Sequence, residues 1–293
     1  MPADLKSQSA MEYLMTYGWA ILAIAIVMVS LYSLGIFNVA NLKPAANPGS
    51  CEVVRTTAQT SLAGQCSNLI PKYVGQFNGA SSINAGTGAN MNFGWTNPFT
   101  ITAWIETSQA AGSYYVIVGK ASGGQGYLLS VNSGEATVYL VGAWASNRIQ
   151  IACSSSVNDG KWHYIATTYN GNKSATGTYV YMDNTQCHAV VADALTSNFA
   201  TNNNVQMGYM AGWGGYQGST ADIQIYNTSL DNTSLKALYQ EGIGGAPIDV
   251  GHLVAWWPLN GNANDYSGNN NQGTSTNIVW NANWQNNYTQ PGS

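Results

Sequence analysis

The residues that could catalyse a reaction are few and far apart in this chain. Glycoside hydrolysis needs two carboxylates about 5–9 Å apart. Such carboxylates usually lie close together on one strand, whereas here the acidic residues outside the N-terminal region form no E-x-D-x-E-like cluster; those considered are Glu106, Glu135, Asp159, Asp183 and Asp222. No Ser-His-Asp or Cys-His arrangement is recognisable, and the WHY sequence around His163 is typical of a packed strand. We therefore predict no catalytic residue and no enzyme activity.

Two short aromatic segments predict carbohydrate binding instead. The sequence AGWGGYQGS offers Trp213, Tyr216 and Gln217, and GAWASN offers Trp144 beside Asn147. Aromatic faces with amide partners on loops of a rigid scaffold suit a glycan site. Trp213 also has an alternative role as a plug in the core.

The segments between these loops alternate between apolar and polar residues, a pattern typical of half-buried strands. Gly, Asn, Ser and Asp clusters separate them, which predicts an antiparallel sandwich or jelly roll. SLDNTSLKALYQEG predicts one short helix with Ser229 or Asp231 as its cap and Gly242 as its stop. The expected strands are 99–106, 114–118, 127–131, 136–141, 162–169, 178–183, 205–210 and 222–226.

The N-terminal stretch has a different character. No residue between Glu12 and Lys43 carries a formal charge, and about 25 residues of helix would span roughly 37 Å, more than the hydrocarbon of a bilayer. We expect a helix over 8–42 that can cross a membrane, and a Pro-rich linker over 43–50. A cut between Ser7 and Gln8 would place a new amino group one helical turn from the Glu12 carboxylate. In a filament of staggered helices, each Glu12 could then neutralise a neighbour's terminus and set the helix register.

The sequence KSQSAMEYLMTYGWAIL resembles the N-terminus of archaeal type IV pilin precursors with class III signal peptides. The family's basic residue, small residue, Gln, Glu and aromatic residue correspond to Lys6, Ser7, Gln8, Glu12 and Tyr13, although Gly or Ala is commoner than Ser before the cut. The resemblance implies removal of residues 1–7 by a prepilin peptidase, a membrane-inserted precursor, and a homopolymer built through the helix by membrane assembly machinery. The alternative is an uncleaved single-pass anchor.

Residues from about Leu69 to Gly242 resemble the laminin-G-like family with the concanavalin-A-like jelly roll. The motifs are YVGQFNGASSINAG, FTITAWIE, DGKWHYIATTYNG, TYVYMDN and ADIQIYNTSLDNTSLKALYQ, in that order. The segment 253–274 resembles the part that normally opens such domains, yet it comes late in the chain. We therefore expect a circular permutation in which 253–259 completes the sheet of a domain covering 51–293. The predicted fold class is α+β, a long N-terminal hydrophobic helix followed by an antiparallel β-sandwich.

Relatives in this family often hold calcium with loop carboxylates and carbonyls. Asp265 in NDYSGNN is the best-placed oxygen ligand here, with Asn262, Asn264 or Asp222 as companions. With so few carboxylates the affinity would be modest. The alternative is that Asp265 caps a turn. No other cofactor is expected.

The cysteines and the composition suit an extracellular protein. Cys51, Cys66, Cys153 and Cys187 match no C-x-x-C signature, and we favour the pairs Cys51–Cys66 and Cys153–Cys187 over the other pairings and over four free thiols. Only 8% of residues are charged, with no basic patch, so nucleic acid is not an expected partner. The N-x-S/T sequons that suit glycosylation are at Asn172, Asn227, Asn232 and Asn287.

Together these features predict a structural subunit of an archaeal pilus-like surface filament that displays a lectin-like domain for adhesion. The partners expected are copies of the same chain and surface carbohydrates. The rival hypothesis is an uncleaved, membrane-anchored extracellular glycan-binding protein.

Overall fold

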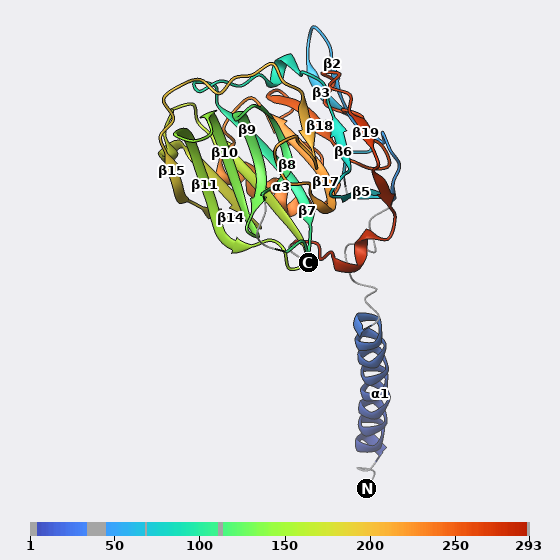
Figure 1. Cartoon of the computed structure of the whole chain (residues 1–293). Helices are drawn as coiled ribbons and strands as arrows, with labels where there is room; N and C mark the ends of the chain where they lie inside the picture. The colour runs from blue at the N-terminus through green and yellow to red at the C-terminus, as the bar shows by residue number, and fades with distance from the viewer. Residues whose placement is uncertain (1–4, 34–44, 68, 111–113, 292–293) are drawn as a thin grey trace. The chain divides into compact units, whose positions relative to one another are not determined.

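The computed structural model describes residues 5–33, 45–67, 69–110 and 114–291. The chain divides into two compact units, Met1–Pro44 with Ser293, and Ala45–Gly292. In the first unit, helix α1 spans Leu5–Ser33 (Figure 1). The predicted helix over 8–42 overlaps α1, whereas residues 34–44, with its predicted end and the start of the linker, lie outside the described residues. In the part of the chain that the structure describes, no helix has the length and apolar character needed to cross a membrane.

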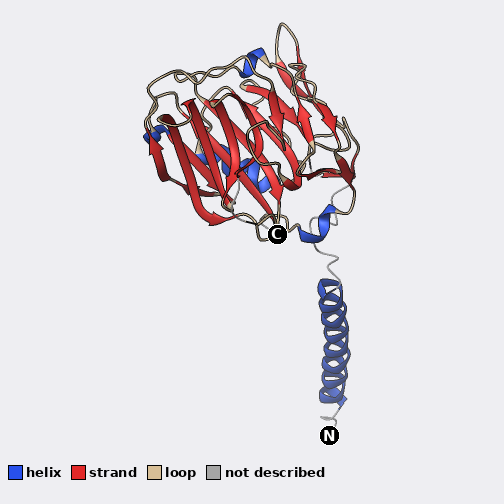
Figure 2. Cartoon of the chain, viewed as in Figure 1, coloured by secondary structure: helices blue, strands red, loops and turns tan. Residues whose placement is uncertain are grey.

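The second unit consists almost entirely of strands and loops (Figure 2). The strands are β1 (Ala45–Ala46), β2 (Cys51–Arg55), β3 (Thr60–Gly64), β4 (Ile70–Pro71), β5 (Val74–Asn78), β6 (Ser82–Asn84), β7 (Phe99–Glu106), β8 (Tyr114–Ser122), β9 (Gln125–Asn132), β10 (Glu135–Ala143), β11 (Asn147–Ser156), β12 (Trp162–Tyr169), β13 (Thr178–Met182), β14 (Thr185–Cys187), β15 (Ala189–Asp193), β16 (Val205–Met207), β17 (Gln217–Tyr226), β18 (Leu253–Trp257), β19 (Thr274–Thr276) and β20 (Val279–Asn281). The helices are α3 (Asn232–Glu241) and the short 3-10 turns η1 (Ala89–Met91), η2 (Ala175–Gly177) and η3 (Trp284–Asn287).

Within the described residues, most strands belong to two eight-stranded antiparallel sheets. Sheet 1 has the order β14-β13-β12-β7-β17-β5-β20, with β18 also paired to β17, and sheet 2 has the order β15-β11-β10-β9-β8-β16-β6-β19. The predicted antiparallel β-sandwich is confirmed. Strands β7 and β12 have the predicted bounds, whereas the long strand β11 was not predicted.

The sandwich forms because the strands alternate apolar side chains across their two faces. In β7, Phe99, Ile101 and Ile105 are fully buried in the main core, while Trp104 points to the opposite face of sheet 1. On that opposite face Trp104 stacks on Tyr239 of α3, with ring centroids 5.8 Å apart. Helix α3 therefore covers the outer face of sheet 1.

Helix α3 begins and ends as predicted. The Asp231 carboxylate accepts a hydrogen bond from the Ser234 amide at 2.8 Å, which caps the N-terminus. Gly242 ends the helix with a φ of 76°, a left-handed conformation that glycine adopts without steric cost.

The segment after α3 returns to the sandwich. Strand β18 pairs antiparallel with β17, with Trp257 opposite Ile223, and the later strands β19 and β20 pair with β6 and β5. Trp257 is fully buried, and its Nε1–H donates to the Asn271 carbonyl at 2.9 Å. The late segment thus contributes to the core and to both sheets.

Sheet 2 carries a second apolar cluster on its outer face. Strands β8, β9 and β10 each turn apolar side chains outward there, where the half-buried Trp213 packs against them. The buried members of this cluster are Val116, Ala121, Leu128, Tyr139, Val141 and Met210. This outer face provides the foundation of the site described next.

Candidate functional site

Three aromatic side chains meet on the outer face of sheet 2. Trp144 lies in the β10–β11 turn, Trp213 in the β16–β17 loop and Tyr114 at the start of β8. The ring centroids of Trp144 and Trp213 are 4.8 Å apart in an edge-on arrangement, and Tyr114 lies 6.0 Å from Trp213 and 6.2 Å from Trp144. We call Tyr114, Trp144 and Trp213 the aromatic site. The structure therefore brings together the two tryptophans that were predicted to bind glycans.

The aromatic site lines an open pocket of about 480 Å³. Glycines at 123 and 124 form one wall and Ala211 with Gly212 another. Gly124 and Gly212 have φ values of +82° and +87°, which only glycine adopts readily, so the backbone turns tightly beside the rings. A Cβ on Gly124 would lie 3.1 Å from the Trp144 Cβ. These glycines keep the wall beside Trp144 free of side chains.

A buried tyrosine supports the exposed rings. Tyr139 is fully buried, with its ring centroid 5.3 Å from that of Trp144 and 5.5 Å from that of Trp213. Its hydroxyl accepts hydrogen bonds from Asn132 Nδ2 at 3.0 Å and Gln150 Nε2 at 3.1 Å. Burial raises the pKa of Tyr139, so the phenol stays neutral. The rings above therefore rest on a fixed and uncharged base.

Arg148 fixes Trp144 from the other side. Its guanidinium carbon lies 5.2 Å from the centroid of the Trp144 ring, a cation–π geometry, and its Nη1 donates to the Trp144 carbonyl. Side chains held in this way lose little conformational freedom on binding a ligand. The turn that presents Trp144 is consequently preorganised.

The exposure of the rings decides what the aromatic site can bind. Tyr114 is 44% exposed and Trp144 36% exposed, while Trp213 is half-buried over the apolar cluster. Trp213 therefore combines the two predicted roles, since it lines the pocket and also covers part of the core. Aromatic faces carry partial negative charge and attract the weakly positive C–H groups of a sugar ring. This arrangement suits stacking on a carbohydrate.

Two residues predicted for the glycan site lie elsewhere. Tyr216 is fully buried, and its hydroxyl donates to the carbonyls of Glu106 at 2.9 Å and Ser219 at 2.8 Å. Its ring packs against Phe77 in the core, so the prediction that it contacts a glycan is wrong. Gln217 is exposed, but it lines a different, polar pocket.

Asp265 takes the role of a turn residue. Its Oδ1 accepts hydrogen bonds from the amides of Trp256 at 3.0 Å and Ser267 at 2.9 Å. Its Oδ2 accepts from Ser267 Oγ at 2.9 Å and the Asn271 amide at 2.8 Å. These four donors occupy the carboxylate, and the structure favours the capping role over the calcium role. No group of three or more His, Cys, Asp or Glu side chains placed to hold a metal occurs among the described residues.

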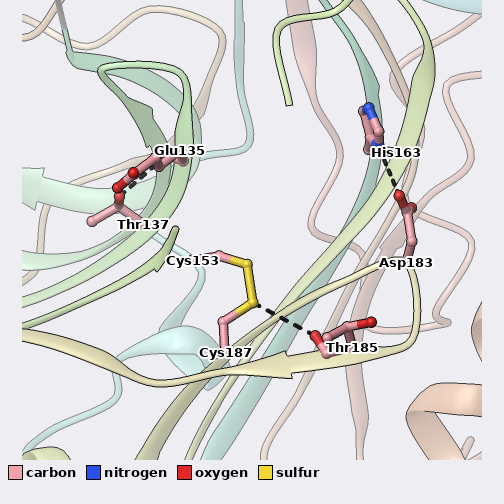
Figure 3. The surroundings of a disulfide bond; sticks show 7 residues. All are labelled: Glu135, Thr137, Cys153, His163, Asp183, Thr185 and Cys187. Atoms are coloured by element: carbon pink, nitrogen blue, oxygen red, sulfur yellow. Dashed lines mark hydrogen bonds and ion pairs between the residues drawn. A yellow bond between two sulfur atoms is a disulfide. The ribbon is translucent and has the colours of Figure 1, made fainter. Parts of the chain in front are cut away.

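The cysteines form the two favoured disulfides. Cys51–Cys66 closes the β2–β3 hairpin, and Cys153–Cys187 joins β11 of sheet 2 to β14 of sheet 1 (Figure 3). In the chain-entropy model, loops of these lengths contribute about 3–4 kcal/mol each. The second disulfide therefore fastens the two sheets together at one edge.

A histidine between two carboxylates was not predicted. His163 Nδ1 lies 2.6 Å from Asp183 Oδ2, and its Nε2 lies 3.0 Å from Asp159 Oδ1 (Figure 3 shows the Asp183 side). The hydrogen bond to Asp183 is the main reason that the pKa of His163 is raised, against the opposing effect of burial. Both ring nitrogens are engaged, so this histidine stabilises the turn of the β13–β14 hairpin. The Asp159–His163 spacing and the Asp-Asn turn after β13 were the available signals.

Another buried carboxylate lies under α3. Asp222 accepts hydrogen bonds from Gln224 Nε2 at 3.0 Å and Trp256 Nε1 at 2.7 Å. Burial raises its pKa to about 7, although these hydrogen bonds oppose the shift. The other acidic residues considered in the sequence stay separate from this one: Glu106 ends β7 and Glu135 begins β10.

The predicted glycosylation sites are all accessible. Asn172, Asn227, Asn232 and Asn287 are exposed. The predicted processing residues Ser7, Gln8 and Glu12 lie within α1, and their side chains are outside the described part of the structure.

The fold and the aromatic pocket define a lectin-like β-sandwich. The chain matches the family model described as the Concanavalin A-like lectin/glucanases superfamily over residues 77–236. Because this match covers more than half of the chain, the protein belongs to that superfamily. No curated protein matches the chain.

Solved structures show the same fold at low sequence identity. A candidate carbohydrate-binding protein from Bacteroides ovatus ATCC 8483 is 18% identical with a TM-score of 0.54; the match covers 78% of this chain and 65% of that one. The heptameric SAP-like pentraxin of Limulus polyphemus is 15% identical with a TM-score of 0.44, over 60% of this chain and 84% of that one. Domains LG4-5 of the mouse laminin alpha1 chain are 16% identical with a TM-score of 0.40, over 61% and 47%.

Proposed function

We propose that the β-sandwich binds carbohydrate at the aromatic site and does so without catalysing a reaction. The observation that carries this proposal is the convergence of Tyr114, Trp144 and Trp213 on one open pocket, from three segments far apart in the sequence. Fold similarity to a candidate carbohydrate-binding protein supports the same ligand class. The lack of a charged side chain among the residues lining the pocket favours neutral sugars.

Affinity electrophoresis of the full chain through gels containing neutral polysaccharides tests this proposal. The wild-type chain is expected to be retarded by at least one polysaccharide. Trp144→Ala should weaken the binding by at least tenfold, about 1.4 kcal/mol, because a ring that anchors a ligand is removed. Tyr209→Ala is the matched control, since Tyr209 is exposed but does not line the pocket. Equal retardation of all three chains would refute the assignment.

We further propose that the N-terminal segment makes the protein a subunit of an archaeal type IV pilus-like filament. The support is the match of Lys6, Ser7, Gln8, Glu12 and Tyr13 to the class III signal pattern, together with the apolar character of α1. The large apolar side chains described in α1, such as Trp19 and Val29, are 49–70% exposed. A helix that is apolar all round needs a partner to cover it, and copies of the same helix would serve.

In this proposal the precursor is inserted in a membrane, a prepilin peptidase removes residues 1–7, and assembly machinery builds an extracellular filament that displays the sandwich for adhesion. N-terminal sequencing of the native chain tests the cleavage step. A chain beginning at Gln8 and present along surface filaments supports the proposal. A chain beginning at Met1 and dispersed as single copies supports the rival proposal, an uncleaved membrane-anchored glycan-binding protein.

A further inference from the structure

A second and larger pocket lies where strands of sheet 1 end. It has a volume of about 930 Å³, within the range of small-molecule sites. Its walls come from β5, the end of β7 with the residues that follow, the start of β17, and Asn287 of η3. None of the residues of the aromatic site lines it. We call it the polar pocket.

The side chains that line the polar pocket are mostly amides and hydroxyls. Gln76, Gln109, Gln217 and Asn287 supply amides, and Ser108 and Ser219 supply hydroxyls. Phe77 and Tyr115 also line the pocket, but both side chains are buried and present no face for stacking. A ligand would be held here by hydrogen bonds.

Part of the wall is fixed in place. Gln109 Nε2 donates to the Gly215 carbonyl at 3.0 Å, and its Oε1 accepts from the Gln217 amide at 2.9 Å. Thr107 Oγ1 donates to the Gln217 carbonyl at 2.7 Å. These bonds connect the segment after β7 to the start of β17. The exposed Gln217 side chain is thus presented from a backbone that is held by two partners.

Glu106 is the charged group of this pocket. The half-buried side chain accepts a hydrogen bond at Oε1 from Asn287 Nδ2 at 2.8 Å. Oε2 makes no hydrogen bond to the described residues that line the pocket and can accept further donors. No lysine, arginine or histidine lines the pocket, so it has no cation to neutralise a phosphate, sulfate or uronic acid. One carboxylate among amides suits a neutral ligand rich in hydroxyl donors.

We propose that the polar pocket is a second carbohydrate site, which binds one neutral sugar residue through its hydroxyl groups, with Glu106 and Gln217 as the principal contacts. This site differs from the aromatic site in mechanism, because it selects by hydrogen bonds to hydroxyls and not by stacking. It exists independently of binding at the aromatic site. The two sites together would let one sandwich hold two sugar residues.

Saturation-transfer NMR on the full chain tests the inference, in a detergent without a sugar headgroup and after expression in a host that does not glycosylate Asn287. The probes are the methyl glycosides of glucose, galactose, mannose and N-acetylglucosamine. The background is Trp144→Ala/Trp213→Ala, in which the aromatic site is removed. At least one probe should still show saturation transfer in this background.

Adding Glu106→Gln to that background should reduce the remaining affinity on the order of tenfold, since a hydrogen bond to a charged group is lost. Gln217→Ala, on an exposed side chain, should weaken the same probe, and Lys161→Ala, an exposed residue that does not line the pocket, should not. The inference is overturned if no probe binds the background variant, if binding is indifferent to Glu106 and Gln217, or if glucuronic acid binds more tightly than glucose. Loss of aromatic-site binding alone leaves this result unchanged, so the two proposals fail separately.

Discussion

Replacing Trp257 by alanine tests whether the late segment of the chain is an essential part of the sandwich. Trp257 is fully buried in the main core, on a strand that pairs with β17, and its indole N–H donates to the Asn271 carbonyl. Truncating a buried tryptophan costs about 3–5 kcal/mol through lost burial and the cavity left behind. For a domain of this size, about 1 kcal/mol shifts the melting temperature by roughly 2–4 °C, so the expected decrease is roughly 6–20 °C.

The assay is thermal unfolding followed by near-UV circular dichroism and by calorimetry. Val279→Ala is the matched control, because Val279 belongs to the same late segment but is 58% exposed on β20, and a surface change of this kind is usually within about 0.5 kcal/mol. If Trp257→Ala melts with the control, the late segment does not stabilise the domain. A chain lacking residues 253–293 that retains a full cooperative melt would contradict the same reasoning.

The remaining predictions concern buried charges and the inter-sheet disulfide. His163→Gln should lower stability most below pH 6.5, because the raised pKa of His163 gives stability that is present below its unfolded pKa and lost as pH rises through the folded pKa; urea melts at pH 5 and 9 check this, and an equal loss at both would oppose it. Asp222→Asn should be nearly neutral at pH 4 and stabilising at pH 8, because an Asp pKa raised to about 7 makes the folded state less stable as pH rises from about 4 to 7; a mutant that keeps the wild-type slope of stability against pH would contradict the assignment. Cys153→Ala/Cys187→Ala should cost about 3–4 kcal/mol by loss of loop closure, measured by denaturant melts, while reduction of the wild-type chain should add no further loss in the double mutant.

The regular strands of the sandwich could be predicted from sequence because their side chains alternate clearly. In β7 every second residue from Phe99 to Ile105 enters the core, and β12 pairs with it along its whole length. Strand β11 was missed although Ile149, Ile151 and Cys153 alternate in the same way. Its outward face carries Arg148 and Gln150, whose polar character comes from their work beneath the aromatic site.

The candidate site was only partly predictable. Trp144 and Trp213 were identified because each lies in a short glycine-containing segment, but their contact depends on the pairing of distant strands. Tyr114 was not identified because nothing in the local sequence of a strand shows that its first residue will lie beside two distant loops. Tyr216 was misassigned because its segment looks exposed, whereas the ring folds back into the core to bond two carbonyls.

Glycan-array binding of the full chain, compared with Trp144→Ala/Trp213→Ala and with the Tyr209→Ala control, tests the central claim most directly. The account predicts a defined set of neutral glycans bound by the wild-type and control chains and lost, by at least tenfold in signal at matched concentration, from the double mutant. Folding of the double mutant is verified by its melt, since Trp213 also covers the apolar cluster on sheet 2. A folded double mutant with the wild-type glycan profile, or a wild-type chain that binds no glycan, would contradict the account.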